Sequence, residues 1–376
     1  MYTGKRVKKD KIHYSIRKLD SYNKKYNFIV SPRILGKSTV MWNKIYKKWK
    51  KYGLPALVVR RYEADITDTY IDAAEDAINT FLPEYKRIQF KYTKSAKTGF
   101  SEVYVDDKLF MRIIALNTKE SRLKSAETAT SLLFFDEFIC NNTSENYVKD
   151  ECNKLNSLYT TYSRAYIKYM KANYDSDKNY CWQCYFCGNC YSIYNPYFAN
   201  LIKVDFSLIK PGAFIVGRNY VIDCPRLSKE LLQWAIDNGI YDTEDDSEYI
   251  KYAFGGEYIN DNHIRVEEKQ PDGYQLKYIF RIQRKYIGMF KDSRSRESIG
   301  FDVGKYWCTT LKPGEFSNNR KVLATDFDNL VAGSKLLNTD QRALLYILSQ
   351  AISKRDISYQ SVAVGYLVEE IYKLIK

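Results

Sequence analysis

The spacing of hydrophobic positions changes several times within the first sixty residues. Residues 26–30 (YNFIV) form a short apolar run, and residues 37–52 (KSTVMWNKIYKKWKKY) alternate apolar and basic positions at a helical period. The loop SPRILG lies between them, and a second apolar run, LPALVVRR, follows Gly53. Strand, loop, helix and strand in this order predict a β-α-β unit, and therefore a parallel sheet.

Similar patterns predict the elements that follow in the first two thirds of the chain. Each predicted helix has apolar residues at helical spacing, and each predicted strand is a short apolar or alternating run. The elements are antiparallel strands within 87–116, buried strands at 131–138 and 181–189, and helices at 67–82, 146–174 and 228–238, the last capped by Ser228.

A cluster of turn residues near 255–275 (FGGEYINDN and QPDGY) predicts a domain boundary. Beyond it, YIFRIQRKYIGMF, ESIGFDV and KVLATDF are each expected to form a strand, and the region 336–375 two helices. We expect a first domain over 1–205 that includes a basic amino-terminal segment, a linker or small subdomain over 206–262, and a smaller α/β domain over 263–376.

Composition narrows the class of protein. The chain has 376 residues, of which 45% are hydrophobic and 15% aromatic, so it has ample material for packed cores and is not a disordered polymer. No apolar run approaches the roughly 18 residues of a membrane span. The charged start lacks an apolar stretch behind it, which argues against a secretory signal. We expect a cytosolic protein with no membrane partner.

The basic charge is concentrated at one end of the chain. Residues 1–60 carry 17 Lys and Arg against 2 Asp and Glu, whereas the rest sums to −1. A local excess of this kind indicates a polyanionic partner, nucleic acid or an anionic membrane surface, or else a solvated lysine-rich face. Two histidines in the whole chain make histidine-based catalysis an unattractive hypothesis.

Four of the eight cysteines follow one another at three-residue intervals in CWQCYFCGNC: Cys181, Cys184, Cys187 and Cys190. Such spacing is typical of iron–sulfur or zinc ligands. The segment is also aromatic and apolar, as in a buried strand, where side chains alternate between faces and these thiols would not converge on one metal. We favour the strand and keep a metal-binding nucleic-acid module as the alternative.

The loop between the first strand and the first helix contains a nucleotide-binding motif. Gly36, Lys37, Ser38 and Thr39 follow the loop at the point where amide groups of a helix start can bind phosphate oxygens. In such a loop the lysine reaches the β- and γ-phosphates, and the serine hydroxyl ligates Mg²⁺. Ser31 stands where the motif has its first glycine, at some steric cost in a tight turn.

A second motif supplies the acids that hydrolysis needs. Residues 132–135 (LLFF) are apolar and lead directly into Asp136 and Glu137. An acid at a strand end can hold Mg²⁺ through water, and a neighbouring carboxylate can orient and deprotonate the attacking water. Asp136 fits the first role and Glu137 the second, which favours hydrolysis over binding alone.

The motifs resemble those of one family, the DNA-packaging (encapsidation) ATPases of phi29-type small tailed phages, relatives of terminase large subunits. The likeness lies in NFIV-SPRILGKS, LVVRRYEADI, LLFFDEF, NYVKDECNKLNSLYTTYSR and GNCYSIYNPYF, in this order, over roughly residues 20–200. It implies an α/β fold: a P-loop ATPase of the additional-strand, catalytic-glutamate type with a parallel central sheet, followed by a smaller RNase H-like domain.

The resemblance also implies roles for individual residues. Lys37, Ser38, Asp136 and Glu137 look like the Walker A and Walker B residues, and Arg33 is similar to the loop arginine of packaging motors. The family's other functional positions fall, by resemblance, on Arg164 as the arginine finger that reaches the neighbouring subunit's ATP, on Asn189 as the coupling residue, and, after a one-residue gap, on Lys124 as a second trans-acting basic residue.

The DNA-contacting loop departs from the family pattern. The segment CNNTSEN lacks basic residues, so contact there would use the neutral side chains of Asn141, Asn142 and Thr143. A grip on phosphates would then come from the basic segment, and phosphate contacts are independent of sequence, as a DNA motor requires. The candidates are Lys44, Lys47, Lys48, Lys50 and Lys51 on the helix expected at 37–52, and Arg60 with Arg61 after the second strand. The alternative is that the lysine run is a solvated helix surface.

The resemblance implies a subunit that hydrolyses ATP with Mg²⁺ and drives double-stranded DNA into a prohead. It implies a homo-oligomeric ring of five subunits, a portal or connector as partner, a packaging RNA as a further partner, and a place in the host cytoplasm and transiently at the portal vertex. The second domain would be a nuclease that has lost its catalytic acids. Asp302, Asp326 and Asp328 keep a terminase with an active nuclease open as the alternative.

Overall fold

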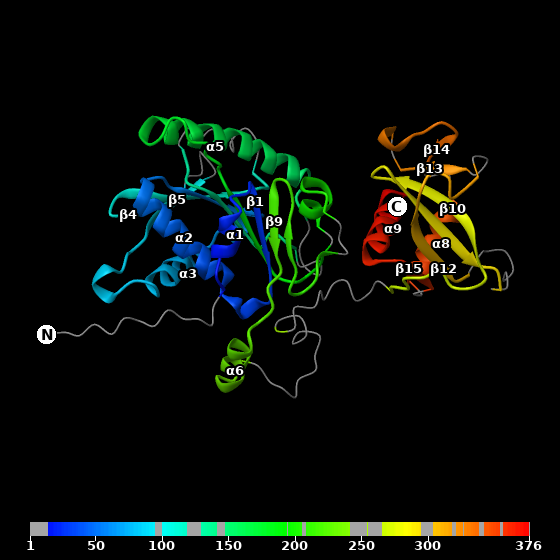
Figure 1. Ribbon diagram of the computed structural model, residues 1–376, viewed down its shortest axis with the longest axis horizontal. Helices are drawn as coiled ribbons and strands as arrows, with labels where there is room; N and C mark the ends of the chain where they lie inside the picture. The colour runs from blue at the N-terminus through cyan, green and yellow to red at the C-terminus, as the bar shows by residue number, and fades with distance from the viewer. Residues whose placement is uncertain are drawn as a thin grey trace. The chain divides into compact units, whose positions relative to one another are not determined.

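The computed structural model divides into two compact units, Met1–Asn260 and Asp261–Lys376. It describes residues 14–94, 100–118, 129–140, 147–193, 195–204, 208–240, 254, 265–294, 304–317, 321–325, 327–337, 342–353 and 356–375. Each unit has its own β-sheet (Figure 1). The range 206–262, expected to be a linker or small subdomain, contributes two strands to the sheet of the first unit.

The sheet of the first unit has a parallel centre. In spatial order its strands are β3 (Lys91–Lys94), β4 (Phe100–Val105), β5 (Lys108–Ala115), β2 (Ala56–Arg60), β6 (Leu133–Asp136), β7 (Cys184–Gly188), β1 (Tyr26–Val30), β9 (Tyr220–Asp223) and β8 (Phe214–Val216). All pairings from β5 to β9 are parallel, and β3, β4 and β8 pair antiparallel. The carboxyl ends of β1, β2, β6 and β7 therefore meet at one edge.

Helices cover both faces of this sheet (Figure 1). On one face lie α1 (Arg17–Ser21), α2 (Lys37–Tyr52) and α3 (Asp68–Asn79), whose Met41, Ile45 and Ile71 join a common core with the sheet. On the other face lies α5 (Glu151–Asn173), where the ring of Tyr162 stacks on Trp182 at 5.8 Å between centroids. This double cover explains why the central strands are continuous apolar runs.

Shorter helices complete the described part of the first unit. They are the 3₁₀ turns η1 (Arg33–Leu35), η2 (Glu63–Asp65) and η3 (Glu84–Lys86), the π-helical turn η4 (Tyr197–Leu201), and α6 (Lys229–Asp237). The capping prediction for α6 is confirmed, because the Ser228 hydroxyl accepts a hydrogen bond from the Leu231 amide at 3.1 Å. No helix among the described residues is long and apolar enough to cross a membrane.

The cysteine-rich segment forms β7, between β6 and β1. Cys187 packs in the core on the α2 side of the sheet, whereas Cys184, three positions earlier, points to the opposite face. Burial raises the pKa of the Cys190 thiol to about 12, so it is protonated at neutral pH. The strand interpretation of this segment is confirmed, and its thiols do not converge on a shared metal site.

The second unit is built on a six-stranded mixed sheet. Its spatial order is β14 (Ser334–Leu336), β13 (Val322–Ala324), β10 (Tyr274–Ile282), β11 (Lys285–Asp292), β12 (Tyr306–Leu311) and β15 (Ile357–Tyr359). The strands β10, β11 and β12 form an antiparallel meander, while β13 and β14 run parallel to β10. The helix α8 (Arg342–Ser353) contacts α9 (Val362–Ile375), which packs on β12 and β15. A 3₁₀ turn, η8 (Phe327–Asn329), follows β13.

The run YIFRIQRKYIGMF, expected to be one strand, is a hairpin. It folds back between β10 and β11 at Gln283 and Arg284, whose φ angles are +48° and +62°. Two consecutive positive φ angles define the two-residue turn that matches the twist of a hairpin. The sequence prediction missed it because neither residue is the Asn or Gly that usually occupies such a turn.

Candidate active site

The loop after β1 has the backbone of an anion-binding helix start. It passes through η1, and Gly36 adopts a φ of +75° immediately before α2, a conformation that suits glycine. Ser31 keeps a negative φ, and its amide donates to the Gly188 carbonyl at 3.2 Å, so the serine fits the loop without the expected strain. The first amides of α2 have no partner within the helix and point toward the space beyond the loop.

Lys37 lies buried at this helix start. Its Nζ donates to Asn189 Oδ1 at 2.6 Å and to the carbonyls of Ser31 and Pro32 at 3.5 and 3.4 Å. Burial lowers the pKa of Lys37 from its ordinary value. The ammonium is thus held by neutral acceptors, and an anion entering the loop would give it a stronger partner.

The next two residues to meet are Ser38 and Asp136. The serine hydroxyl donates to Asp136 Oδ1 at 3.0 Å, which joins the start of α2 to the end of β6. Burial raises the pKa of the Asp136 carboxyl to about 6, and the neighbouring Glu137 adds to this rise, while Arg60 opposes it. A hydroxyl and a carboxylate oxygen side by side suit Mg²⁺, whose remaining ligands would be waters and phosphates.

The raised pKa of Asp136 predicts a stability gain on neutralisation. The pKa rises from 3.8 to about 6 on folding, so above pH 6 the ionised carboxylate destabilises the folded state, and below pH 4 it contributes nothing. We expect Asp136→Asn to increase the free energy of unfolding at pH 8 by about 1–3 kcal/mol without Mg²⁺ or nucleotide, and the gain to shrink as the pH falls through 6. Urea unfolding at pH 8 and pH 5 measures this, and an equal stability at pH 8 would contradict it.

Glu137 occupies a strained position directly after β6. Its φ is +59°, which costs a non-glycine residue about 1–2 kcal/mol. The carboxylate is 54% exposed and pairs with Arg60, whose Nη2 lies 2.9 Å from Glu137 Oε2. Arg60 is itself only 11% exposed and packs over the ring of Tyr70. The exposed acid is therefore held by a buried cation from the neighbouring strand β2.

A cavity of about 320 Å³ opens at this edge of the sheet. Its walls come from the loop after β1, the start of α2 and the ends of β6 and β7. It is lined by Arg33, Gly36, Lys37, Ser38, Thr39, Asp136, Glu137 and Asn189, all of which the sequence singled out for nucleotide binding or hydrolysis. The structure brings these eight residues together, and their individual roles stay predictions.

Comparison with known proteins identifies the family. The family described as podovirus DNA encapsidation protein (Gp16) matches residues 8–362, nearly the whole chain. The chain belongs to this family. The DNA packaging proteins of Bacillus phages PZA and phi29 are each 26% identical to this chain over 281 residues, which cover 72% of this chain and 72% of each relative. The resemblance stated from the sequence is thereby confirmed.

A solved structure extends the likeness to the fold. This chain is similar to a chain of the bacteriophage phi29 viral genome packaging motor assembly, with a TM-score of 0.66 and 20% identity, over 97% of this chain and 100% of the other. At this level of identity the match establishes a shared fold for both units and leaves the chemistry to be argued from the residues.

Other residues that the sequence analysis proposed for catalysis or DNA contact lie away from the cavity. Arg164 is exposed in the middle of α5, where its Nε donates to the Thr160 carbonyl at 3.0 Å. Lys47 is exposed on α2, but the half-buried Lys48 donates to Gln183 Oε1 at 3.4 Å, and burial, with Lys44 nearby, lowers its pKa to about 7. This placement argues against Lys48 as a phosphate-gripping residue.

Arg60 is likewise only 11% exposed and pairs with Glu137, which argues against DNA contact there. Some predictions fall outside the described residues, namely those on Lys124, Asn141, Asn142, Thr143, Asp302 and Asp326. The side chain of Asp328 is not described either.

Sequence reasoning missed two residues that support the site, Tyr191 and Glu151, and assigned a third, Arg61, to DNA contact. Tyr191, just after β7, accepts a hydrogen bond through its hydroxyl from Arg33 Nη2 at 2.8 Å. Arg61 and Glu151 form a buried pair beneath the turn that carries Glu137. Arg61 could have been found from its position, because it directly follows a central parallel strand, where site residues gather.

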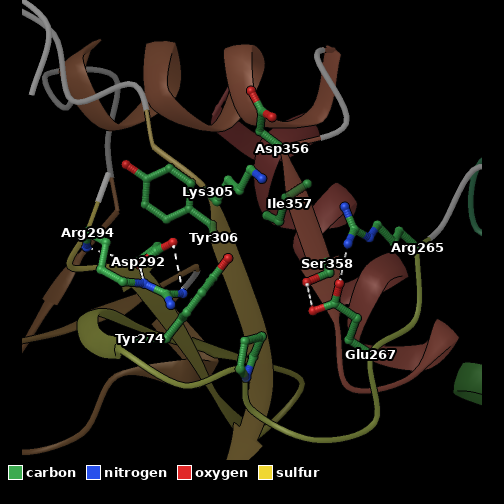
Figure 2. A pocket seen from close by; sticks show the side chains of 11 residues that line it. Arg265, Glu267, Tyr274, Asp292, Arg294, Lys305, Tyr306, Asp356, Ile357 and Ser358 are labelled. Atoms are coloured by element: carbon green, nitrogen blue, oxygen red, sulfur yellow. Dashed lines mark hydrogen bonds and ion pairs between the residues drawn. The ribbon is translucent and has the colours of Figure 1, made fainter. Parts of the chain in front are cut away.

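Figure 2 shows a second cavity, of about 210 Å³, in the second unit at the ends of β10, β11, β12 and β15. Four of its charged groups form two pairs: Arg294 Nε lies 3.0 Å from Asp292 Oδ1, and Arg265 bonds to Glu267, which also accepts from the Ser358 hydroxyl. Among the described residues of the protein, no group of three or more acids, histidines and cysteines could hold a metal ion.

Proposed function

We propose that this chain is a Mg²⁺-dependent P-loop ATPase that drives double-stranded DNA into a prohead. The observation that carries this proposal is the strand order β6-β7-β1. A strand inserted between the phosphate-loop strand and the acidic strand is the arrangement of the additional-strand, catalytic-glutamate ATPases. It sets Lys37, Asp136, Glu137 and Asn189 around one cavity.

The contacts at the cavity supply a binding sequence for MgATP. The phosphates would replace Asn189 as the hydrogen-bond acceptor of Lys37, because a charged acceptor forms a stronger hydrogen bond with an ammonium than an amide oxygen does. Bound Mg²⁺ would be held by Ser38 and, through water, by Asp136, and would neutralise the phosphate charge. Asn189, released at the end of β7, can then report nucleotide binding to the segment that follows.

The Arg60–Glu137 pair gives the site a resting state. While Arg60 Nη2 donates to Glu137 Oε2 at 2.9 Å, that carboxylate oxygen is engaged by the arginine and is not positioned to accept a hydrogen bond from an attacking water. A water in line with the γ-phosphate would need Glu137 turned away from Arg60 toward the cavity. Hydrolysis would thus require a rearrangement of one exposed side chain.

The proposal is tested by ATP turnover of the purified protein with Mg²⁺, with and without duplex DNA and with and without proheads. DNA- or prohead-stimulated hydrolysis supports a packaging ATPase. A protein that binds no ATP and shows no turnover under any of these conditions would exclude it. Supercoiled plasmid in the same reactions reports any nuclease activity.

The lysine of the phosphate loop gives a separate prediction. We expect Lys37→Ala to weaken ATP binding by about 10–100-fold, because it removes a charge-assisted contact to the phosphates from a site shielded from water. Equilibrium binding of a fluorescent ATP analogue measures it. Lys47→Ala, an exposed lysine on the same helix, is the matched control, and equal affinities of the two variants would contradict the role of Lys37.

The second unit is proposed to be an RNase H-like domain without nuclease activity. The order β12-β11-β10-β13-β14, an antiparallel meander of three strands followed by two strands parallel to the first, supports this fold, and β15 adds a sixth strand beside β12. The central strand β10 (YQLKYIFRI) carries no carboxylate, although a two-metal nuclease needs an acid there. Arg281 on β10 donates instead to the Asn329 carbonyl at 2.8 Å. This favours a docking role over the alternative of an active terminase nuclease.

The assembly is proposed to be a ring on the portal vertex, in the host cytoplasm. Arg164 is exposed on α5, on the helix that begins beside the cavity, and it lies 13 residues from Glu151, or roughly 20 Å along the axis. This separation supports a role for Arg164 at a neighbour's ATP and not at its own. Five subunits and a packaging RNA are parts of the proposal that rest on the family resemblance.

A further inference from the structure

We propose that Arg61, anchored by Glu151 and Tyr197, is a positioning residue that holds the backbone of Glu137 in the conformation hydrolysis requires. The inference rests on the proposed ATPase function and adds to it a group that touches neither ATP nor water. It concerns a buried ion pair that joins the turn after β6 to the first residue of α5.

The guanidinium of Arg61 grips two consecutive carbonyls. Nη1 donates to the Glu137 carbonyl at 3.1 Å, and Nη2 donates to the Phe138 carbonyl at 2.5 Å. On its other side, Nε lies 3.2 and 3.3 Å from the two oxygens of Glu151. Three donors of one planar group are thus used at once, which fixes the position of the turn relative to Glu151.

The partner carboxylate is equally committed. Glu151 also accepts from the Val148 amide at 2.8 Å and from the Tyr197 hydroxyl. The side chains of Arg61 and Glu151 are 3% and 1% exposed, and the guanidinium packs against the rings of Phe135 and Tyr147. Buried pairs of this kind rarely stabilise a fold more than apolar residues would, so a role in geometry is the better explanation for this one.

The turn needs such a restraint because of what it carries. Glu137 has a positive φ, and its exposed carboxylate is paired with Arg60 at 2.9 Å. When the carboxylate leaves Arg60 to orient water, its position depends on the backbone from which it projects. A second restraint, the Phe138 amide donating to the Cys187 carbonyl at 3.2 Å, fixes only the far side of the turn.

The anchor also lies on two other elements. Glu151 is the first residue of α5, and Tyr197 is the first residue of η4, so the turn, the helix and the segment after β7 share one buried carboxylate. A displacement of α5, which carries Arg164, would therefore act on the two carbonyls that Arg61 holds. Positioning of Glu137 and placement of α5 are joined through Arg61.

The decisive variant is Arg61→Lys, which keeps the charge opposite Glu151. Its three donors sit on one nitrogen, so they are unable to span Glu151 and both carbonyls as the planar guanidinium does. We expect its kcat for ATP to fall about 30-fold or more, while the Kd for a fluorescent ATP analogue changes less than about threefold. The matched control is Arg112→Lys. Arg112 pairs with Glu102 at 2.8 Å on β5 and β4 of the same sheet, partly buried and outside the cavity, and its replacement should leave kcat within about twofold of wild type.

A readout independent of hydrolysis is amide hydrogen exchange of the segment 133–140. Release of the two carbonyls should speed exchange of this segment in Arg61→Lys and not in Arg112→Lys. Glu151→Gln, which keeps the size of the anchor, should show the same change to a smaller degree and a kcat loss of about fivefold, so the proposal does not depend on one variant folding.

The outcomes separate this inference from the proposed function. An active wild type with undiminished kcat in Arg61→Lys, or an unchanged exchange rate of segment 133–140, would overturn the positioning role. A parallel loss of ATP affinity in Arg61→Lys would also overturn it, since that is the result of general disruption. A wild type no more active than Glu137→Gln would overturn the proposed function and the catalytic part of this inference, while exchange would still decide whether Arg61 holds the turn.

Discussion

Glu137→Gln is expected to lower the ATP turnover of the protein by about 10³-fold while leaving ATP binding intact. The amide keeps the size of the side chain but is unable to take a proton from water, and a positioned general base contributes roughly 10²–10⁴-fold. The phosphate contact proposed for Lys37 and the Mg²⁺ contact proposed for Ser38 do not involve this carboxylate, so affinity should change little. Steady-state hydrolysis and analogue binding on the same preparation measure the two quantities.

A nearby carboxylate provides the control for this prediction. Glu63 is exposed in η2, three residues after Arg60, and does not line the cavity, so Glu63→Gln should turn over ATP like the wild type. Undiminished turnover in Glu137→Gln would show that another group activates the water. Loss of both binding and turnover would mean that Glu137 supports the structure of the cavity, a role we do not assign to its side chain.

The predictable part of this site was the part that lies at strand ends. The loop 31–39 and the pair Asp136 and Glu137 are recognisable because each follows an apolar run, and parallel strands bring their carboxyl ends to one edge. The order of the strands was not predictable in the same way. The sequence shows a β-α-β unit in β1, α2 and β2, but nothing local says that β6 and β7 will enter between its two strands.

Strand order also decides which charges meet. Arg60 and Glu137 are 77 positions apart, and Arg61 and Glu151 are 90 apart, yet each pair is joined because β2 and β6 are neighbours. From composition alone the two arginines belong to a basic segment suited to DNA. In the structure both arginines form ion pairs at the site, Arg60 with Glu137 and Arg61 with Glu151. Lys44, another residue of the basic segment, pairs with Asp20. A charge count locates basic residues but is blind to their partners.

Arg164→Ala is expected to lower turnover about 10²–10³-fold in the assembled ring, with ATP binding unchanged. An arginine supplied by a neighbour stabilises the charge that develops in phosphoryl transfer and is worth roughly 10³–10⁵-fold at its largest. Within the chain, the Arg164 guanidinium bonds to the Thr160 carbonyl of its own helix and is exposed for another subunit to use. Lys168→Ala, one turn further along the same exposed face, is the matched control and should retain turnover.

Mixing two inactive variants distinguishes an arginine that acts on a neighbour from one that acts within its own chain. Arg164→Ala keeps Lys37 and its cavity, and Lys37→Ala keeps Arg164, so at equal proportions about a quarter of the interfaces in a randomly mixed ring would join a working cavity to a working arginine. Turnover should then exceed the sum of the separate variants, because those interfaces regain both components. A mixture no more active than that sum, in rings shown to exchange subunits, would place Arg164 outside the neighbour's reaction and remove the physical reason for inferring a ring from this residue.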